Sequence, residues 1–128
     1  MTKLLLDTHV FIWWISGNEL LGENAREMIA NPVNEVYVSA ATVWEMSIKK
    51  QLGKLEAPDD IEQVVTQSGF LPLPISMFHA QQAGTLPTHH KDPFDRMLIA
   101  QAQADGLVVV TKDEFFPHYG IRLLDATK

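Results

Sequence analysis

Residues 106–113 read Gly-Leu-Val-Val-Val-Thr-Lys-Asp, and this stretch decides the fold class. The β-branched run within Gly106–Thr111 predicts a strand buried on both faces, as in a parallel sheet. Lys3–Leu6 is a second short apolar run, and an acid, Asp7, follows it directly. Because the carboxyl ends of parallel strands meet at one edge of a sheet, where sites gather, we expect Asp7 and Asp113 to lie close together.

Strands and helices alternate along the rest of the chain. Further strands are expected at Val36–Ser39, Phe70–Leu73 and Ile121–Leu124. Helices are expected over Val10–Ile15, Glu23–Ala30, Ala40–Leu52, Ile61–Ser68, Met77–Gly84 and Pro93–Asp105. This alternation predicts a three-layer α/β/α sandwich with a mostly parallel central sheet. A length of 128 residues fits a single domain spanning residues 1–128.

Composition narrows the classes of function. No apolar run approaches the roughly 18 residues that suggest a membrane span, and the apolar N-terminal run is too short for a signal peptide. Cysteine is absent, which excludes disulfides, thiolate zinc sites and cysteine nucleophiles. We therefore expect a cytoplasmic protein. The net charge of -6 argues against a broad basic surface for nucleic acid, and it suits carboxylates gathered around a cation, although a local basic patch is compatible with it.

Glu45 falls within the predicted helix Ala40–Leu52. The apolar stripe of this helix consists of Ala41, Trp44, Ile48 and Leu52. Glu45 lies at the edge of that stripe, and a carboxylate held near a core needs a partner or a metal ion. The alternative is a surface ion pair with Lys49, four residues on, which contributes on the order of a few tenths of a kcal/mol.

Asp95 heads the most apolar face of the helix predicted at Pro93–Asp105. That face continues through Leu98, Ile99 and Ala102. Asp92 is suited to cap this helix, and Asp95 then falls at the third helical position, where an acid favours the helix dipole. Capping explains Asp92 well, but it does not explain why Asp95 lies on the apolar face. We therefore assign Asp92 mainly to capping and Asp95 mainly to a site.

The acids at the strand ends have a simpler interpretation when each is taken alone. An acid after a strand often caps the next helix or turn, and this applies to Asp7 and Asp113. Four acids at one sheet edge, however, would repel one another strongly unless a cation lay among them. Mg²⁺ and Mn²⁺ prefer oxygen ligands, and with phosphodiester substrates such ions activate water and stabilise the leaving oxygen. The number of ions, one or two, stays open.

Four ordered motifs resemble those of a known family. They are Leu4–His9 (Leu-Leu-Leu-Asp-Thr-His), Ser39–Glu45 (Ser-Ala-Ala-Thr-Val-Trp-Glu), His89–Ala102 with its Asp-Pro-Phe-Asp-Arg core, and Val110–Asp113. Together they resemble PIN domains, and within that family the VapC-type ribonuclease toxins of bacterial toxin–antitoxin pairs. The resemblance implies a PIN-like fold and a metal-dependent endoribonuclease. It implies Mg²⁺ or Mn²⁺ held by an acidic quartet of Asp7, Glu45, Asp95 and Asp113. It also implies an RNA substrate, a cognate antitoxin protein and a homodimer.

Other side chains near the acids are candidates for accessory roles. Thr8, Ser39 and Asp92 are candidates to support the metal ligands, with helix capping as the alternative for Ser39. Lys91, Arg96 and Lys112 flank the acids and are candidates to contact the RNA backbone. His89 and His90 precede Asp92 in a polar loop, for which we expect a surface position, with a role near the substrate as the alternative. Trp44 is expected in the core, and one of Trp13 and Trp14 near the surface, as a hypothetical dimer or antitoxin contact.

Two other functions stay open on the sequence alone. A Mg²⁺-dependent aspartyl phosphatase also begins with a strand ending in an aspartate, but its chemistry usually needs a second acid two residues on, where this chain has His9. A PIN-like binding module that has lost catalysis would keep the fold, although the presence of all four acids argues against it. A covalent phosphoenzyme at Asp7 would favour the phosphatase, and a failure to cleave RNA with any metal would favour the binding module.

Overall fold

Five parallel strands form the centre of the molecule, in the order β3-β2-β1-β4-β5. They are β1 (Lys3–Leu6), β2 (Glu35–Ser39), β3 (Leu71–Leu73), β4 (Val108–Thr111) and β5 (Leu123–Asp125). The computed structural model describes every residue from Met1 to Lys128. Leu5 of β1 pairs with Tyr37 of β2 on one side and with Val109 of β4 on the other. The two strands that the sequence indicated most clearly, β1 and β4, are therefore neighbours.

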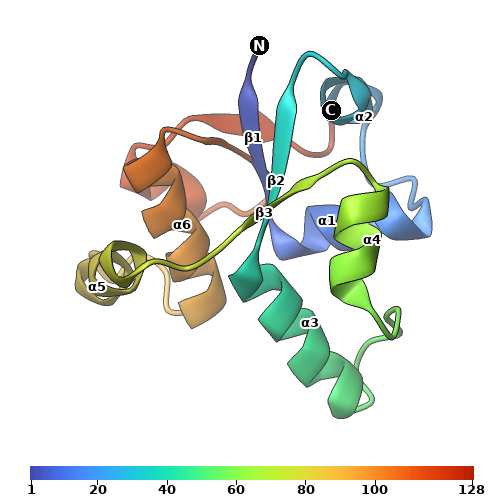
Figure 1. The fold of residues 1–128 in the computed structure, drawn as a ribbon. Helices are drawn as coiled ribbons and strands as arrows, with labels where there is room; N and C mark the ends of the chain where they lie inside the picture. The colour runs from blue at the N-terminus through green and yellow to red at the C-terminus, as the bar shows by residue number, and fades with distance from the viewer.

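Helices cover both faces of this sheet. They are α1 (Thr8–Ser16), α2 (Glu23–Ala30), α3 (Ala40–Gln51), α4 (Ile61–Gln67), α5 (Met77–Thr85) and α6 (Pro93–Asp105), with a short 3₁₀ helix, η1, at Phe116–Tyr119. Helices α1, α2 and α4 lie on one side and α5 and α6 on the other, while α3 extends from the end of β2 beyond the sheet (Figure 1). The predicted three-layer sandwich is confirmed, and the sheet is parallel throughout. None of the helices combines the length and apolar character that a bilayer crossing requires.

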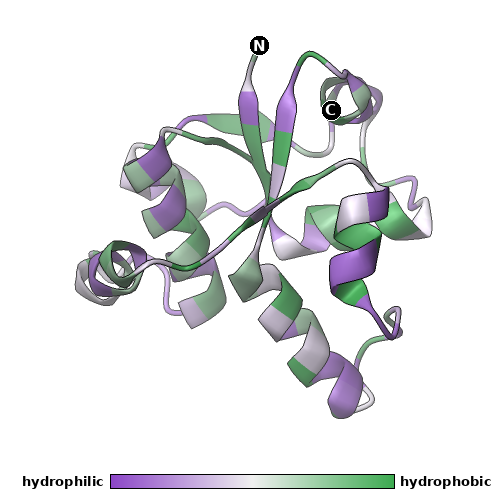
Figure 2. Ribbon diagram, viewed as in Figure 1, coloured by the Kyte–Doolittle hydropathy of each residue, from purple (hydrophilic) through white to green (hydrophobic).

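The core consists of two hydrophobic clusters, one on each face of the sheet. Leu4 and Leu6 of β1 belong to the cluster under α1, α2 and α4, whereas Leu5 belongs to the cluster under α5 and α6. This division follows from the alternation of side chains along a strand, and all three leucines are fully buried. Figure 2 shows the central strands coloured mainly as hydrophobic and the flanking helices as mixed. The sheet is thus packed on both faces, and this packing fixes the strand ends at its carboxyl edge.

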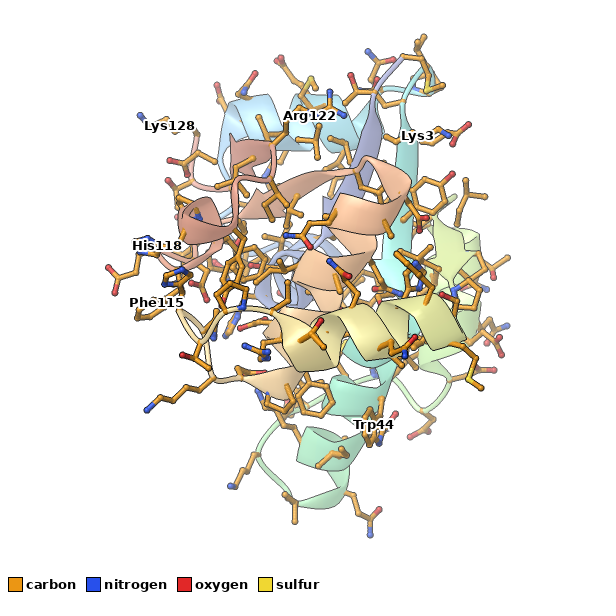
Figure 3. All side chains as sticks on the ribbon, turned by 90° about the vertical axis from the view of Figure 1, so that its left-hand side faces the viewer. Lys3, Trp44, Phe115, His118, Arg122 and Lys128 are labelled. Atoms are coloured by element: carbon orange, nitrogen blue, oxygen red, sulfur yellow. The ribbon has the colours of Figure 1, made fainter.

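Helix α3 turns a different face to the protein than the sequence predicted. The expected core stripe is largely exposed: the exposed fraction is 61% for Trp44, 38% for Ile48 and 62% for Leu52. The buried residues of α3 are Ala41, Thr42, Glu45 and Met46. The prediction failed because α3 projects past the sheet edge, so its buried side is set by the helices beside it rather than by its apolar stripe. Figure 3 labels Trp44 on this helix.

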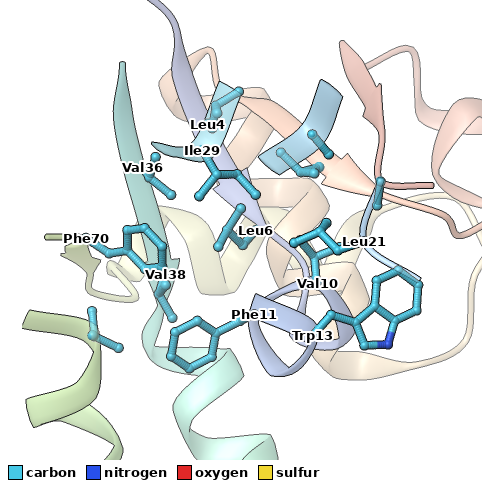
Figure 4. Close-up of a cluster of buried hydrophobic side chains, with 14 of the residues drawn as sticks. Leu4, Leu6, Val10, Phe11, Trp13, Leu21, Ile29, Val36, Val38 and Phe70 are labelled. Atoms are coloured by element: carbon cyan, nitrogen blue, oxygen red, sulfur yellow. The ribbon is translucent and has the colours of Figure 1, made fainter. Parts of the chain in front are cut away.

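The adjacent tryptophans of α1 differ in burial. Trp13 is buried within the cluster that also holds Phe11 and Leu21, as Figure 4 shows. Trp14 is half-buried, and its ring packs against Phe70 with the centroids 5.6 Å apart. Trp14 is the more exposed of the two, as adjacent positions on a helix require. Its packing against Phe70 weakens the hypothesis that it anchors a dimer or antitoxin contact.

Candidate metal centre

Asp7 stands at the carboxyl end of β1, where the chain enters α1. Its backbone N–H continues the sheet ladder by donating to the carbonyl of Val110 in β4 (3.1 Å). One carboxylate oxygen caps α1 by accepting the N–H of Val10 (2.8 Å), and the other accepts the hydroxyl of Thr111 (2.5 Å). The carboxyl group is buried, with Asp7 only 4% exposed. The capping role that the sequence offered is therefore present, and it is combined with a buried position against β4.

Asp113 lies two residues beyond the end of β4, at the same edge of the sheet. Its Oδ1 accepts the N–H of Phe115 (2.7 Å), which holds the turn that leads into η1. Its own N–H donates to Oγ1 of Thr111 (2.9 Å), the hydroxyl that donates to Asp7. Thr111 thus links the two acids that the parallel strands were predicted to bring together. In this strand order the connection reverses direction between β1 and β4, and ligands of open α/β sheets bind outside such a point.

Asp95 reaches this edge from the N-terminus of α6. Asp92 caps the helix, as predicted, by accepting the N–H groups of Phe94 (2.8 Å) and Asp95 (3.2 Å). Oδ2 of Asp95 lies 3.0 Å from Nε2 of His90, which is also 3.0 Å from Oδ2 of Asp113. Ligand-type atoms of these three residues all lie within 4.8 Å of one another. A loop residue, a helix N-terminus and a strand end therefore converge.

The expectation of a surface position is met by His89 and is wrong for His90. His89 is exposed, whereas the side chain of His90 is only 11% exposed. The difference arises because the ring of His90 turns inward between the acids and packs near Phe115 and Phe116. The only signal in the sequence was its spacing, two residues before the cap of α6, which places it at the same helix end as Asp95.

Glu45 lies on the buried face of α3. Its Oε2 pairs with Nζ of Lys49 at 2.7 Å, so the ion pair that the sequence offered as an alternative is present. Its Oε1 is buried and has no hydrogen-bond partner. Asp92 and Asp95 both help to raise the pKa of Lys49, after the larger effect of its hydrogen bond to Glu45, so Lys49 lies in the field of the α6 acids. Neither Glu45 nor Asp7 is part of the compact set formed by His90, Asp95 and Asp113.

The electrostatics of the site favour a bound cation. Burial raises the pKa of Asp95 to about 7, with further contributions from the negative charges of Asp92, Asp7 and Asp113 and an opposing one from His90. Burial also raises the pKa of Asp7, against the lowering effect of the Thr111 hydrogen bond. Raised carboxyl pKa values mean that negative charge is costly here, and a cation would offset that cost. Carboxylate oxygens, one of them an unpartnered buried atom of Glu45, fit a hard divalent ion such as Mg²⁺ or Mn²⁺.

The supporting residues predicted beside the acids make mainly structural contacts. Ser39 caps α3 by accepting the N–H of Ala41 (3.0 Å), which is the capping role offered for it. The hydroxyl of Thr8, next to Asp7, lies 3.1 Å from that of Thr42 and so joins the start of α1 to α3. These contacts fix the backbone that carries Asp7 relative to the helix that carries Glu45.

The three basic side chains predicted to contact RNA differ in how far they are engaged by other groups of the protein. Lys91 and Lys112 are exposed, and Nζ of Lys112 lies 5.1 Å above the ring of Trp13. The guanidinium of Arg96 instead donates to four backbone carbonyls, those of Ala83, Leu86, Pro87 and His90. The donors on its Nη1 and Nη2 are therefore engaged within the protein, where they hold the loop before α6, and the RNA contact of Arg96 stays a prediction.

A model of the PIN domain matches residues 4–121 of this chain. The chain belongs to the PIN domain family. PIN domains are nucleases, which hydrolyse phosphodiester bonds, and they typically use divalent metal ions. The cluster of acids lies at the carboxyl edge of the sheet of this PIN domain. No curated protein matches the chain.

Several solved toxin–antitoxin complexes contain a chain of the same fold. The DNA-bound VapBC of Salmonella typhimurium matches this PIN domain with a TM-score of 0.71 and 28% identity, over 98% of both chains. VapBC2 of Rickettsia felis, bound to a promoter fragment, has a TM-score of 0.69 and 18% identity, over 96% of this chain and 98% of that one. VapBC-1 of nontypeable Haemophilus influenzae has a TM-score of 0.65 and 18% identity, over 99% and 100%. At 18% identity these last two establish the fold alone. The resemblance to VapC-type PIN domains is confirmed.

Proposed function

We propose that this PIN domain is a Mg²⁺- or Mn²⁺-dependent endoribonuclease and the toxin of a VapBC-type toxin–antitoxin pair. The observation that carries the proposal is the compact group of Asp95 and Asp113 around His90, with Asp7 close enough for its charge to raise the pKa of Asp95, at the carboxyl edge of β1 and β4 in a chain of a nuclease family. A cluster of carboxylates in this position matches what phosphodiester hydrolysis with a metal ion requires.

The carboxylates of Asp7, Asp95 and Asp113 would hold the ion, and Glu45 would contribute its unpartnered Oε1 from α3. When bound, the ion activates the attacking water and stabilises charge on the leaving oxygen of the phosphodiester. The chain's own contribution is to fix the carboxylates in advance. Asp7 is held by Val10 and Thr111, and Asp113 is held by Phe115 and Thr111, so little reorganisation remains for the reaction.

Binding of the RNA strand requires local positive charge, because the chain as a whole carries a net charge of -6. Lys91 and Lys112 flank the acids on exposed positions, and we propose that they contact phosphates beside the scissile bond. Contacts of this kind position a strand without reading its sequence, so the choice of RNA target lies elsewhere.

The proposed partners are suggested by the solved complexes in which similar chains occur. The matching structures from Salmonella typhimurium and Rickettsia felis are of VapBC, and another match, from Klebsiella pneumoniae, is described as a toxin–antitoxin complex. We therefore propose a cognate antitoxin that binds this chain and blocks its site. The homodimer rests on the family resemblance. A phosphatase is less favoured, because the position two residues after Asp7 holds His9, an exposed histidine, where that chemistry needs an acid.

Cleavage of total cellular RNA by the purified, antitoxin-free protein tests the proposal. The assay compares Mg²⁺, Mn²⁺ and EDTA, and it includes Asp7→Asn and Asp95→Asn alongside Glu27→Gln, which changes an exposed acid on α2. We expect cleavage that needs metal, persists in Glu27→Gln and is lost in both aspartate variants. Mapping the cut ends would then identify the target. Absence of cleavage by folded wild-type protein with every metal would refute the nuclease function.

A further inference from the structure

His90 occupies the centre of the acidic cluster, although none of the expected metal ligands is a histidine. Its Nε2 is 3.0 Å from Oδ2 of Asp95 and 3.0 Å from Oδ2 of Asp113. These two acids come from different elements, the start of α6 and the loop after β4. The imidazole is therefore the one group that touches both carboxylates, and its role is either to bind the ion with them or to hold them for it.

The other ring nitrogen decides between these roles. Nδ1 of His90 accepts the backbone N–H of Asp92 at 3.2 Å. A nitrogen that accepts an N–H carries no proton, so in the neutral ring the proton lies on Nε2. A protonated Nε2 donates a hydrogen bond and has no lone pair for a metal ion. Ligation through Nε2 would move the proton to Nδ1 and set two N–H groups against each other.

The loop that carries His90 is fixed from both sides. The guanidinium of Arg96, adjacent to Asp95 in sequence, donates to the carbonyl of His90 (3.0 Å) and to the carbonyls of Ala83, Leu86 and Pro87. The hydroxyl of Tyr119 in η1 accepts the N–H of His90 (2.7 Å) and donates to the carbonyl of Pro87 (2.7 Å). These hydrogen bonds from two side chains to the main chain around His90 set where its ring stands.

We propose that His90 is a positioning residue of the metal centre, which holds the carboxylates of Asp95 and Asp113 together through its Nε2–H and does not bind the ion itself. The inference rests on the proposed metal-dependent function. Two carboxylates that face each other repel, and a shared donor between them offsets that repulsion. Removing such a hydrogen-bond partner of metal ligands typically weakens metal binding by about 10- to 100-fold.

Calorimetric titration with Mn²⁺ of wild type, His90→Leu and His90→Gln tests this role. His90→Leu removes the hydrogen-bond donor between the two carboxylates, and we expect about 10- to 100-fold weaker binding. His90→Gln places an amide N–H near the position of Nε2, and we expect it to restore most of the loss. His89→Leu is the matched control, because His89 packs on the rings of His118 and Tyr119 and touches no acid. It should bind Mn²⁺ as wild type does.

Pulsed electron paramagnetic resonance on the Mn²⁺-loaded wild type supplies a readout that does not depend on the folding of a variant. We expect no nitrogen bound directly to Mn²⁺. A directly coordinated nitrogen would make His90 a ligand and overturn the proposal, and so would wild-type affinity in a folded His90→Leu. If wild type itself binds neither Mn²⁺ nor Mg²⁺, the metal-dependent function fails, and this inference fails with it. Failure of wild type to bind metal therefore refutes the proposed function, whereas a coordinated nitrogen, or wild-type affinity in His90→Leu, refutes only the role of His90.

Discussion

Replacing Asp95 with asparagine is expected to stabilise the metal-free protein at neutral and higher pH. The pKa of Asp95 is raised from 3.8 to about 7 by burial and by the neighbouring acids. A raised pKa means that the folded state binds the proton more tightly than the unfolded state does. The stabilising contribution of this group is therefore complete below pH 3.8 and is lost as the pH rises through about 7.

The size of this effect follows from the same change in pKa. A rise from 3.8 to about 7, at about 1.36 kcal/mol per pKa unit, corresponds to roughly 4 kcal/mol of unfolding free energy lost across this range. The carboxyl of Asp95 is 21% exposed, so solvent screening removes only part of that value. The asparagine side chain does not ionise, and it keeps an oxygen that accepts the Nε2–H of His90. The variant should therefore escape the loss and exceed wild type in stability at about pH 8 by up to about 4 kcal/mol.

Urea denaturation followed by circular dichroism, in EDTA at several pH values between about 4 and 8, measures this difference directly. We expect the two unfolding free energies to converge near the acid end of this range and to separate with rising pH, with wild type the less stable. Saturating Mg²⁺ should narrow the gap, because the ion offsets the charge that destabilises wild type. Glu27→Gln, an exposed substitution on α2, should follow wild type at every pH. An Asp95→Asn variant that is less stable than wild type at the alkaline end would refute the reasoning.

Four further outcomes are expected. Asp92→Asn should retain most of the cleavage activity, since asparagine also caps α6, and loss as complete as in Asp95→Asn would make Asp92 part of the metal centre. Arg96→Met should expose the loop before α6 to limited proteolysis, because it removes four hydrogen bonds to that loop and to the end of α5, and wild-type resistance would contradict this role. Lys112→Ala should weaken binding to RNA. It should also reduce the dependence of the binding constant on salt concentration by the equivalent of about one phosphate contact, measured by fluorescence anisotropy with Ca²⁺ in place of Mg²⁺. Leu5→Ala should lower the unfolding free energy by about 2–5 kcal/mol in urea denaturation, and a loss under about 1 kcal/mol would contradict its place in the core.

Much of the fold could be predicted because its local signals agree with one another. Helix α6 has the predicted bounds, and it begins where the capping acid Asp92 indicates. Strand β1 has the predicted bounds, since an apolar run that ends at an acid is well defined at both ends. Strand β4 begins at Val108, two residues later than predicted, because Gly106 serves the end of α6 instead. The pairing of β1 with β4 follows from the parallel arrangement.

The predictions that missed the structure concern residues whose surroundings depend on contacts between elements distant in the sequence. The periodicity of α3 identifies an apolar stripe, but it does not say that the helix leaves the sheet and turns Glu45 inward and Trp44 outward. The sequence near His90 is polar, and only the fold brings the end of β4 against it. Arg96 looked like a surface cation beside an acid, whereas the loop that folds over α6 supplies carbonyls for its hydrogen bonds. Each of these positions is set by packing between distant segments, which a local sequence pattern does not indicate.

Anomalous diffraction from crystals soaked in Mn²⁺ tests most directly whether the acids at the ends of β1 and β4 form a metal centre. We predict an ion bound by carboxylate oxygens of Asp7, Asp95 and Asp113 at the carboxyl edge of the sheet, with His90 hydrogen-bonded to a carboxylate and not to the ion. An ion bound elsewhere, or none at a Mn²⁺ concentration that supports cleavage, would contradict the assignment of this site.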